Sequence, residues 1–199
     1  GPDDVVLGIL PFFHIYGLVV ILGGSFREGV KVVSMPRFEL EPLLQAMQDH
    51  KVSIAMLVPP LVLAFAKHPV IAKYDLSAMH TIFSGAAPLG PGLADAVRKR
   101  FPSVRLRQGY GLTEASPTTH FHPLRHERDE PDAIGPAVPN TECRLVDPET
   151  GRDVGPGERG ELWVRGPQVM LGYRNNAAAT AECLTADGWL KTGDVATAD

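Results

Sequence analysis

The sequence predicts an α/β fold, with a mostly parallel sheet and flanking helices followed by a small β-rich subdomain. In the first half, short apolar β-branched runs alternate with segments of helical periodicity, which is typical of parallel α/β proteins. After about Pro117 this alternation gives way to short strands and turns. The 199 residues include 20 glycines and 18 prolines, so turns are frequent and a simple helical bundle is excluded. We expect two parts, residues 1–120 and 121–199.

One predicted helix, over 39–50, carries apolar residues at helical spacing. Leu40, Leu43, Leu44 and Met47 fall on one face. Strands are expected over 5–10, 30–34, 52–58, 80–83 and 104–108, and helices over 14–25, 39–50, 61–67 and 92–101. Because a helix follows each strand but the last, successive strands should run parallel.

The second half contains two short runs that alternate as half-buried strands do, 142–146 and 161–164. Between them, 147–151 and 155–157 are rich in Asp, Pro and Gly, which favour tight turns. This half is therefore expected to form the β-rich subdomain.

The net charge and the spacing of the cysteines limit the partners and the cellular location that we expect. The chain has 19 basic and 23 acidic residues, a net charge of −4, and no block of like charge. This argues against a nucleic-acid partner. Cys143 and Cys183 form no CxxC motif, which favours a reducing, cytoplasmic location. The stretch 5–26 lacks charged residues, but Pro11 and four glycines interrupt it, so we expect no integral membrane span.

Two loops follow predicted strands at the edge where open parallel sheets bind ligands. The loop 84–88 consists of small residues, so a flat ligand can approach its backbone closely. The loop 108–114 offers an aromatic ring (Tyr110), a hydroxyl (Thr113) and a carboxylate (Glu114), which suit a base, a phosphate and Mg²⁺. From spacing alone, both loops could equally be tight turns.

Histidines and one aspartate are weaker candidates. His14 follows the first strand, where a hydrogen-bonded core role is the commoner one. His120, His122 and His126 have no carboxylate or cysteine at a convincing spacing, so no metal site is expected among them. Asp194 could accept hydrogen bonds from a ribose diol or simply belong to a turn.

Five segments taken in order are more specific than any one of them: LPFFHIYG at 10–17, SGAAPL at 84–89, QGYGLTE at 108–114, GELWVRG at 160–166 and GWLKTGD at 188–194. Together they resemble the acyl-adenylate-forming superfamily of acyl-CoA synthetases, peptide-synthetase adenylation domains and luciferases. Within it, the chain looks most like the 4-coumarate–CoA ligases. The resemblance covers essentially the whole chain.

The resemblance implies an ATP-dependent ligase that forms an acyl-AMP and then an acyl-CoA thioester, with ATP, Mg²⁺ and CoA as cofactors. It implies stacking of Tyr110 on adenine, a Thr113 contact to phosphate, Mg²⁺ at Glu114 and a ribose contact at Asp194. With His14 beside the reacting carboxylate, the implied catalytic residues are His14, Thr113 and Glu114. The implied nucleotide-binding residues are Gly85, Ala86, Ala87, Pro88, Gln108, Gly109, Tyr110, Gly111, Thr113 and Asp194.

The same resemblance implies a pocket for a small carboxylic acid and a cationic contact to CoA through Arg37. Val20 offers no polar group for ring hydroxyls, which favours a cinnamate-like or medium-chain acid, in phenylpropanoid or fatty-acid metabolism. The implied acyl-binding residues are His14, Tyr16, Gly17, Val20, Gln108, Gly109 and Pro117.

The sequence also departs from the family pattern. The Ser/Thr/Gly-rich phosphate loop is absent before His14, and the hinge and mobile domain are absent after Asp199. We therefore expect an internal fragment of the large N-terminal domain, inactive by itself and prone to self-association through cut edges. Two alternatives are an adenylation domain that loads a carrier-protein thiol, and a catalytically silent fragment that binds nucleotide or acyl ligand.

Overall fold

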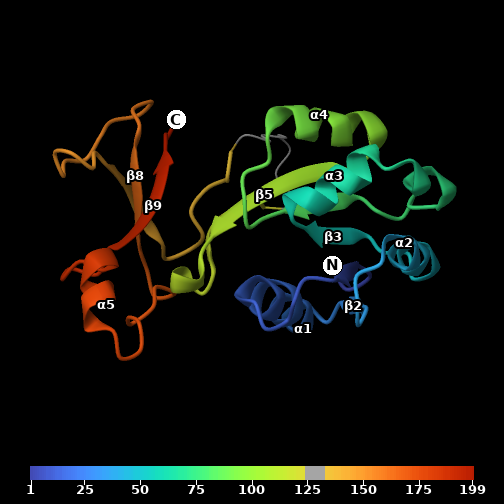
Figure 1. The fold of residues 1–199 in the computed structure, drawn as a ribbon, viewed down its shortest axis with the longest axis horizontal. Coiled ribbons are helices and arrows are strands. Elements are labelled where there is room, and N and C mark those ends of the chain that lie inside the picture. The colour runs from blue at the N-terminus through green and yellow to red at the C-terminus, as the bar shows by residue number, and fades with distance from the viewer. Residues whose placement is uncertain (124–132) are drawn as a thin grey trace. The chain divides into compact units, whose positions relative to one another are not determined.

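The computed structural model describes residues 1–123 and 133–199 of the chain, which forms two compact units (Figure 1). The first unit comprises residues 1–111 and 120–136, and the second comprises residues 112–119 and 137–199. A domain boundary at residue 120 stays a proposal.

A six-stranded sheet organises the first unit, in the order β2-β1-β3-β4-β5-β6. The pairs β1/β2, β1/β3, β3/β4 and β4/β5 are all parallel. Its strands are β1 (Val5–Gly8), β2 (Lys31–Ser34), β3 (Ile54–Leu57), β4 (Thr81–Ser84), β5 (Arg105–Gly111) and β6 (Thr118–Phe121). The predicted mostly parallel sheet is confirmed.

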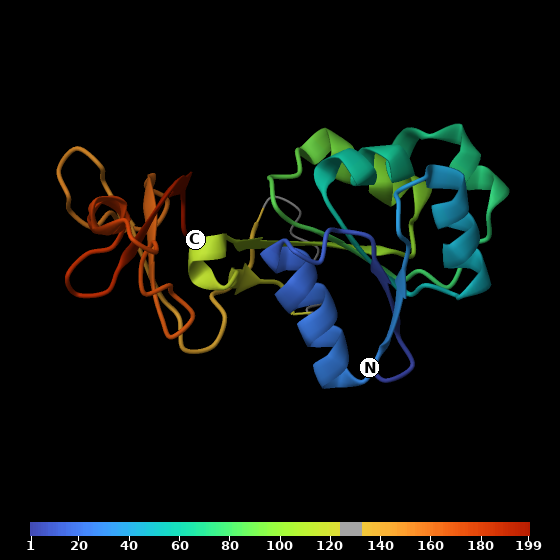
Figure 2. The same ribbon diagram turned by 60° about the horizontal axis from the view of Figure 1, so that its bottom comes forward.

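Helices cover both faces of this sheet. Figures 1 and 2 show α3 and α4 on one side and α1 on the other. The helical elements of the first unit are η1 (Tyr16–Gly23), α1 (Gly24–Glu28), α2 (Leu40–Asp49), α3 (Pro59–Lys67), η2 (Pro69–Lys73) and α4 (Pro91–Arg100). The element η1 is a π-helix that continues directly into α1. Wide helical turns of this kind are frequent at functional sites.

The core follows from the alternation of side chains along the strands. On β4, Ile82 belongs to the larger apolar cluster, which also holds buried residues of α2, α3 and α4. Phe83 faces the opposite side, where it joins a smaller cluster with Tyr16 and Ile21 of η1. Both sheet faces are therefore buried, which explains why β1 and β3 are apolar throughout.

The second unit contains a three-stranded antiparallel sheet in the order β7-β8-β9. Its strands are β7 (Glu142–Val146), β8 (Gly160–Arg165) and β9 (Leu190–Ala196), and a short helix α5 (Ala177–Cys183) and a 3₁₀ turn η3 (Thr113–Ala115) accompany them. On one face the guanidinium of Arg144 stacks 4.6 Å from the Trp163 ring centroid and 4.7 Å from that of Trp189. This confirms the predicted small β-rich part.

Five elements of the described residues were not predicted: β6, α5, β9 and the short 3₁₀ helices η2 and η3. No helix within residues 1–123 and 133–199 is long and apolar enough to span a membrane. The uncharged stretch 5–26 instead divides into β1, a loop and the helical segment that begins at Tyr16.

Candidate active site

The predicted loops lie at the carboxyl ends of neighbouring parallel strands. The small-residue loop begins at Ser84, the last residue of β4, and Gln108 to Gly111 form the end of β5. In the register of this pair, Ser84 lies beside Gln108. The two loops therefore start side by side at the edge of the sheet where ligands of open α/β folds bind.

Tyr16 packs directly beneath the loop that starts at Gly85. A Cβ atom added at Gly85 would lie 3.1 Å from the Tyr16 ring, so only glycine fits against it without displacement. The Tyr16 side chain is buried, and burial raises the pKa of its hydroxyl. This hydroxyl has no hydrogen-bond partner among the described residues. Buried polar groups without a partner are uncommon in folded proteins, which keeps Tyr16 a candidate for contact with a ligand.

Gln108 anchors the far end of the same loop. Its side-chain oxygen accepts a hydrogen bond from the backbone N–H of Leu89 at 2.9 Å, and both residues are buried. Between these fixed ends, Ala86, Ala87 and Pro88 are exposed, and Ala86 adopts a left-handed conformation with φ of 70°. The loop thus presents backbone and small side chains outward on a rigid base.

Close packing explains the glycine at position 109. An added Cβ would lie 2.6 Å from the tip of the Phe83 ring, which is buried and stacked on Phe121 at a centroid distance of 4.7 Å. The next residue, Tyr110, lies 6.1 Å from the ring of His120, also between centroids. Burial lowers the pKa of His120, which favours its neutral form. The Tyr110 ring thus lies beside the His120 ring at a tilt of 59°, and its stacking on adenine stays a prediction.

His14 lies in the loop between β1 and η1 and is exposed. Its Nδ1 accepts a hydrogen bond from the backbone N–H of Tyr16 at 3.1 Å. In the neutral ring the proton is then on Nε2, which is left to donate to a ligand. A Cβ at Gly17 would lie 2.3 Å from the Pro11 carbonyl oxygen, so glycine is required for this turn. Val20 is half-buried on η1, and Arg37 is exposed after β2.

The turn that carries Thr113 and Glu114 belongs to the second unit. Leu112 N–H donates to the Pro117 carbonyl oxygen at 2.9 Å, which closes the loop around η3. Thr113 is exposed, Glu114 is half-buried and Pro117 is buried. A hydroxyl and a carboxylate are thus presented from one closed turn. The oxygen atoms of these groups are suitable ligands for Mg²⁺. This ion usually binds to one or two protein groups together with phosphates, and seldom to a site made of protein groups alone.

Asp194 lies in a β-bulge of strand β9. The register with β8 pairs Glu161 with Val195 and Trp163 with Lys191, so residues 192–194 bulge outward opposite a single residue of β8. Gly193 has a φ of 77°, which glycine tolerates, and Asp194 is exposed. Such bulges often re-aim a side chain beside a functional site. The sequence motif was recognised, but the bulge that presents Asp194 was not predicted.

Two residues that support this machinery were missed. The Tyr173 hydroxyl donates to Glu114 Oε1 at 2.6 Å, and the carboxylate raises the pKa of Tyr173 to about 12. Glu161 accepts a hydrogen bond from Gly193 N–H at 2.9 Å. Both contacts join positions more than thirty residues apart, so no local sequence pattern marks them.

The histidine-rich segment gives no metal centre within the described residues. The Nε2 atom of His122 is 3.1 Å from the Ala133 carbonyl oxygen, and His120 is buried beside Tyr110. His126 lies outside the described residues. Elsewhere in residues 1–123 and 133–199, no three His, Cys, Asp or Glu side chains are grouped so that they could hold a metal ion.

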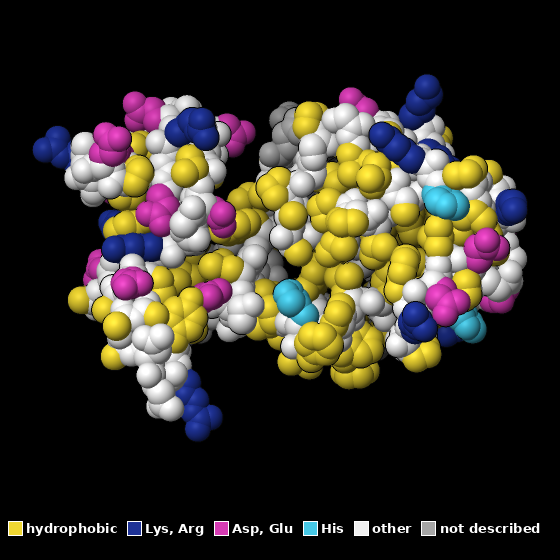
Figure 3. All heavy atoms as spheres, viewed as in Figure 1, with side chains coloured by type: hydrophobic (Ala, Val, Ile, Leu, Met, Phe, Trp, Pro, Cys, Tyr) yellow, Lys and Arg dark blue, Asp and Glu magenta, His cyan; other side chains and the backbone are white. Residues whose placement is uncertain are grey.

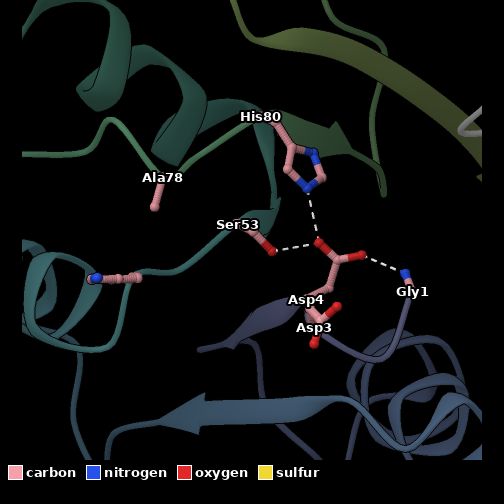
Figure 4. A pocket seen from close by; sticks show the side chains of 7 residues that line it. Gly1, Asp3, Asp4, Ser53, Ala78 and His80 are labelled. Carbon is pink, nitrogen blue, oxygen red and sulfur yellow. Dashed lines mark hydrogen bonds and ion pairs between the residues drawn. The ribbon is translucent and has the colours of Figure 1, made fainter.

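A separate pocket of about 450 Å³ lies at the amino ends of β1, β3 and β4, the edge opposite the predicted loops. Figure 4 shows Asp4 at its centre, with Ser53 and His80 turned toward the carboxylate. Asp4 Oδ1 accepts from Ser53 Oγ at 2.7 Å and lies 2.8 Å from His80 Nε2. These bonds tie together the starts of three strands, which is a structural role.

Comparison with known proteins shows which proteins the chain resembles. The chain is 44% identical over 198 residues to Probable 4-coumarate--CoA ligase 1 of Dictyostelium discoideum, covering 99% of this chain and 36% of that protein. It is 46% identical over 200 residues to 4-coumarate--CoA ligase 1 of Arabidopsis thaliana, again covering 99% and 36%. The chain thus spans little more than a third of the length of these relatives.

Among solved structures, ATP-bound MatB from Rhodopseudomonas palustris superposes with a TM-score of 0.88 at 29% identity, covering 100% of this chain and 38% of that one. The expected resemblance to acyl-adenylate-forming proteins is therefore confirmed in sequence and in fold. The family of AMP-binding enzymes matches residues 1–174, and the chain belongs to that family.

Proposed function

We propose that the chain supplies the acyl- and adenylate-binding part of an ATP-dependent carboxylate–CoA ligase. The observation that carries this proposal is the 44–46% identity to 4-coumarate–CoA ligases across 99% of the chain. In the proposed reaction the substrate carboxylate attacks the α-phosphorus of ATP and pyrophosphate leaves. The thiol of CoA then attacks the acyl carbon, and AMP leaves with the bonding electrons.

The nucleotide would be bound by the residues that the loops present. Tyr110 would stack on adenine while the loop 85–88 follows the base, and Thr113 would donate to the phosphate. Mg²⁺ held by Glu114 would neutralise charge on the phosphates during adenylation. Asp194, presented by the bulge of β9, would accept hydrogen bonds from the ribose hydroxyls.

The acyl group would lie against the segment between His14 and Val20. The buried Tyr16 hydroxyl, which has no hydrogen-bond partner among the described residues, supports a pocket there. The half-buried Val20 is apolar, which favours a cinnamate-like or medium-chain acid. His14 Nε2 would donate to the reacting carboxylate. Gln108, Gly109 and Pro117 would complete the lining.

Arg37 would contact the phosphates of CoA, since it is an exposed cation. The competing acceptor is a carrier-protein thiol. The two are separated by testing whether free CoA is acylated by the whole protein. Cys143 and Cys183 are not joined by a disulfide, in keeping with the cytoplasmic location we propose. The 199 residues alone are proposed to bind the adenylate without turnover.

A calorimetric titration tests the proposal with non-hydrolysable analogues of cinnamoyl-AMP, 4-coumaroyl-AMP and octanoyl-AMP, and with AMP alone. We expect saturable binding of at least one acyl-AMP analogue that is tighter than binding of AMP. The variant Tyr110→Ala should weaken all of them, because base stacking contributes about 1–3 kcal/mol. Absence of binding to all four ligands would contradict the proposal.

A further inference from the structure

Tyr173 and Glu114 are joined twice in the second unit. The Tyr173 hydroxyl donates to Glu114 Oε1 at 2.6 Å, and Met170 N–H donates to the Glu114 carbonyl oxygen at 2.7 Å. A hydrogen bond to an ionised carboxylate is among the stronger ones in proteins. Both the side chain and the backbone of Glu114 are therefore held by the segment 170–173.

This segment is itself fixed by Thr180 of α5. Thr180 Oγ1 accepts from Tyr173 N–H at 2.9 Å and lies 2.9 Å from the Asn176 carbonyl oxygen, to which it donates. The Asn176 side chain in turn accepts from Ala179 N–H at 3.1 Å at the start of the helix. A continuous set of hydrogen bonds thus leads from α5 through Thr180 and Tyr173 to the carboxylate of Glu114.

Close packing keeps the Thr180 side chain in place. A Cβ added at Gly172 would lie 2.7 Å from Thr180 Cγ2 and 2.9 Å from Thr180 Oγ1. Gly172 also has a φ of 140°, a conformation that other residues rarely adopt. The backbone before Tyr173 therefore fits tightly against Thr180.

We propose that Tyr173 is a positioning residue, fixed by Thr180, that holds Glu114 in the orientation required to bind the nucleotide's divalent cation. This inference rests on the proposed function. The hydrogen bond occupies Oε1 and leaves Oε2 for the cation, so the carboxylate need not lose rotational freedom when the ion arrives. Groups that orient a metal ligand in this way typically change metal affinity by 10–100-fold when removed.

The test measures Mn²⁺ binding to the 199-residue chain with α,β-methylene-ATP, by electron paramagnetic resonance of the free ion. Tyr173→Phe removes only the hydroxyl, and we expect about a tenfold rise in the Kd for Mn²⁺. The Kd for the nucleotide in EDTA should stay within about twofold of the wild type. A general loss of structure would raise both Kd values. A rise in the Kd for Mn²⁺ alone therefore indicates a positioning role.

Thr180 gives a second, independent pair of variants. Thr180→Val keeps the shape but loses the hydroxyl, and should also weaken Mn²⁺ binding, by a smaller factor than Tyr173→Phe. Thr180→Ser keeps the hydroxyl and should restore wild-type binding. If Thr180→Val fails to fold by circular dichroism, the single-atom variant Tyr173→Phe still decides the question.

Two matched controls remove equivalent hydroxyls elsewhere. Tyr74→Phe breaks the contact of another tyrosine hydroxyl with a glutamate, Glu41, at 3.5 Å. Thr185→Val removes a hydroxyl that accepts from a backbone N–H, that of Trp189, at 2.9 Å. Neither residue contacts Glu114 in these hydrogen bonds, so both variants should bind Mn²⁺ as the wild type does.

The outcomes separate this inference from the proposed function. If the wild type binds neither the nucleotide nor its Mn²⁺ complex, the proposed function is contradicted, and the inference falls with it. If the wild type binds and Glu114→Gln weakens Mn²⁺ binding but Tyr173→Phe does not, only the positioning role is contradicted. An unaffected Glu114→Gln variant would also overturn it.

Discussion

Glu161 accepts a hydrogen bond from the backbone N–H of Gly193 at 2.9 Å, immediately before Asp194. Its other carboxylate oxygen accepts from Trp163 Nε1 at 2.8 Å, so the side chain is fixed at both ends. The bulge that presents Asp194 is therefore held by a residue of the neighbouring strand. The proposed ribose contact of Asp194 would therefore depend on a residue that is not itself proposed to touch the nucleotide.

Replacement of Glu161 by Leu should weaken AMP binding by roughly three- to tenfold. The bulge loses a hydrogen bond to a charged group, which contributes about 1.5–3 kcal/mol at most. Only part of this loss would affect AMP binding, through a change in the position of Asp194. Calorimetry with AMP measures the effect. The matched control is Glu158→Leu, which removes a carboxylate that accepts from Gly155 N–H at 2.7 Å. Equal affinities of the two variants would refute the role of Glu161.

Substitution of Gly109 by Ala should destabilise the first unit by about 1–3 kcal/mol, because the new methyl group collides with the buried Phe83 ring. Urea unfolding monitored by fluorescence gives the change. Gly92→Ala is the control, since a Cβ there meets no atom within 4 Å and the residue lies in α4. That variant should be unchanged or slightly more stable. A neutral Gly109→Ala would show that Phe83 moves freely.

Two buried serines should respond oppositely to replacement by Ala. Ser84 Oγ has no partner among the described residues, so Ser84→Ala should leave stability unchanged or raise it. Ser53 Oγ accepts from Val5 N–H and donates to Asp4, so Ser53→Ala should cost about 1–3 kcal/mol. Thermal unfolding of both variants decides. A costly Ser84→Ala would reveal a partner for that hydroxyl.

Stability should fall below about pH 4 because of Asp4. Burial raises the pKa of Asp4, but hydrogen bonds from the terminal ammonium, Ser53 and His80 outweigh this and lower it from 3.8 to about 2. A folded-state pKa below the unfolded one stabilises the fold above both values, and that stabilisation is lost as pH falls through them. The contribution is about 1 kcal/mol after allowance for solvent screening.

The variant Asp4→Asn provides the comparison for this pH dependence. Urea unfolding of the two proteins between pH 5 and pH 2 should show a steeper loss for the wild type. Parallel curves would mean that other carboxylates account for the acid sensitivity.

The 199 residues should self-associate at high concentration. Hydrophobic side chains gather where Figure 1 shows α1, as the space-filling view in Figure 3 makes plain. Phe26 of α1 is 74% exposed, and Phe13 in the loop before η1 is 92% exposed. Apolar surface of this kind favours association. Sedimentation velocity should show concentration-dependent species that the double variant Phe13→Ser, Phe26→Ser reduces. A monomer at every concentration would contradict this expectation.

The strands β1 to β4 were predictable because each is a short, largely apolar run between turn residues, whereas β5 has Leu106 between Arg105 and Arg107. The strand β6 was not, since Thr118–Phe121 includes a histidine and follows a turn-rich segment. The helix α5 buries no residue and so has no apolar stripe to recognise. In β9, Gly193 suggested a turn, whereas contacts with β8 keep the segment extended around a bulge.

The candidate site, like the fold, has parts that the sequence predicts and parts that it does not. The loops 84–88 and 108–114 were predictable from small residues and from polar groups that follow strands. Their supports were not, because Tyr173 and Glu161 contact residues 59 and 32 positions away. Gln108 has a role that its motif does not predict. The motif predicts a ligand contact, and in the structure the Gln108 side chain also accepts a hydrogen bond from Leu89 N–H, which fixes the end of the loop.

The most direct test of the central claim is an NMR titration of the ¹⁵N-labelled chain with AMP. The proposed function predicts saturable shifts of the backbone amides of Gly85, Tyr110, Thr113 and Gly193, and none around Asp4. Shifts confined to the pocket around Asp4, or no saturable shifts at all, would contradict the assignment of these loops to nucleotide binding.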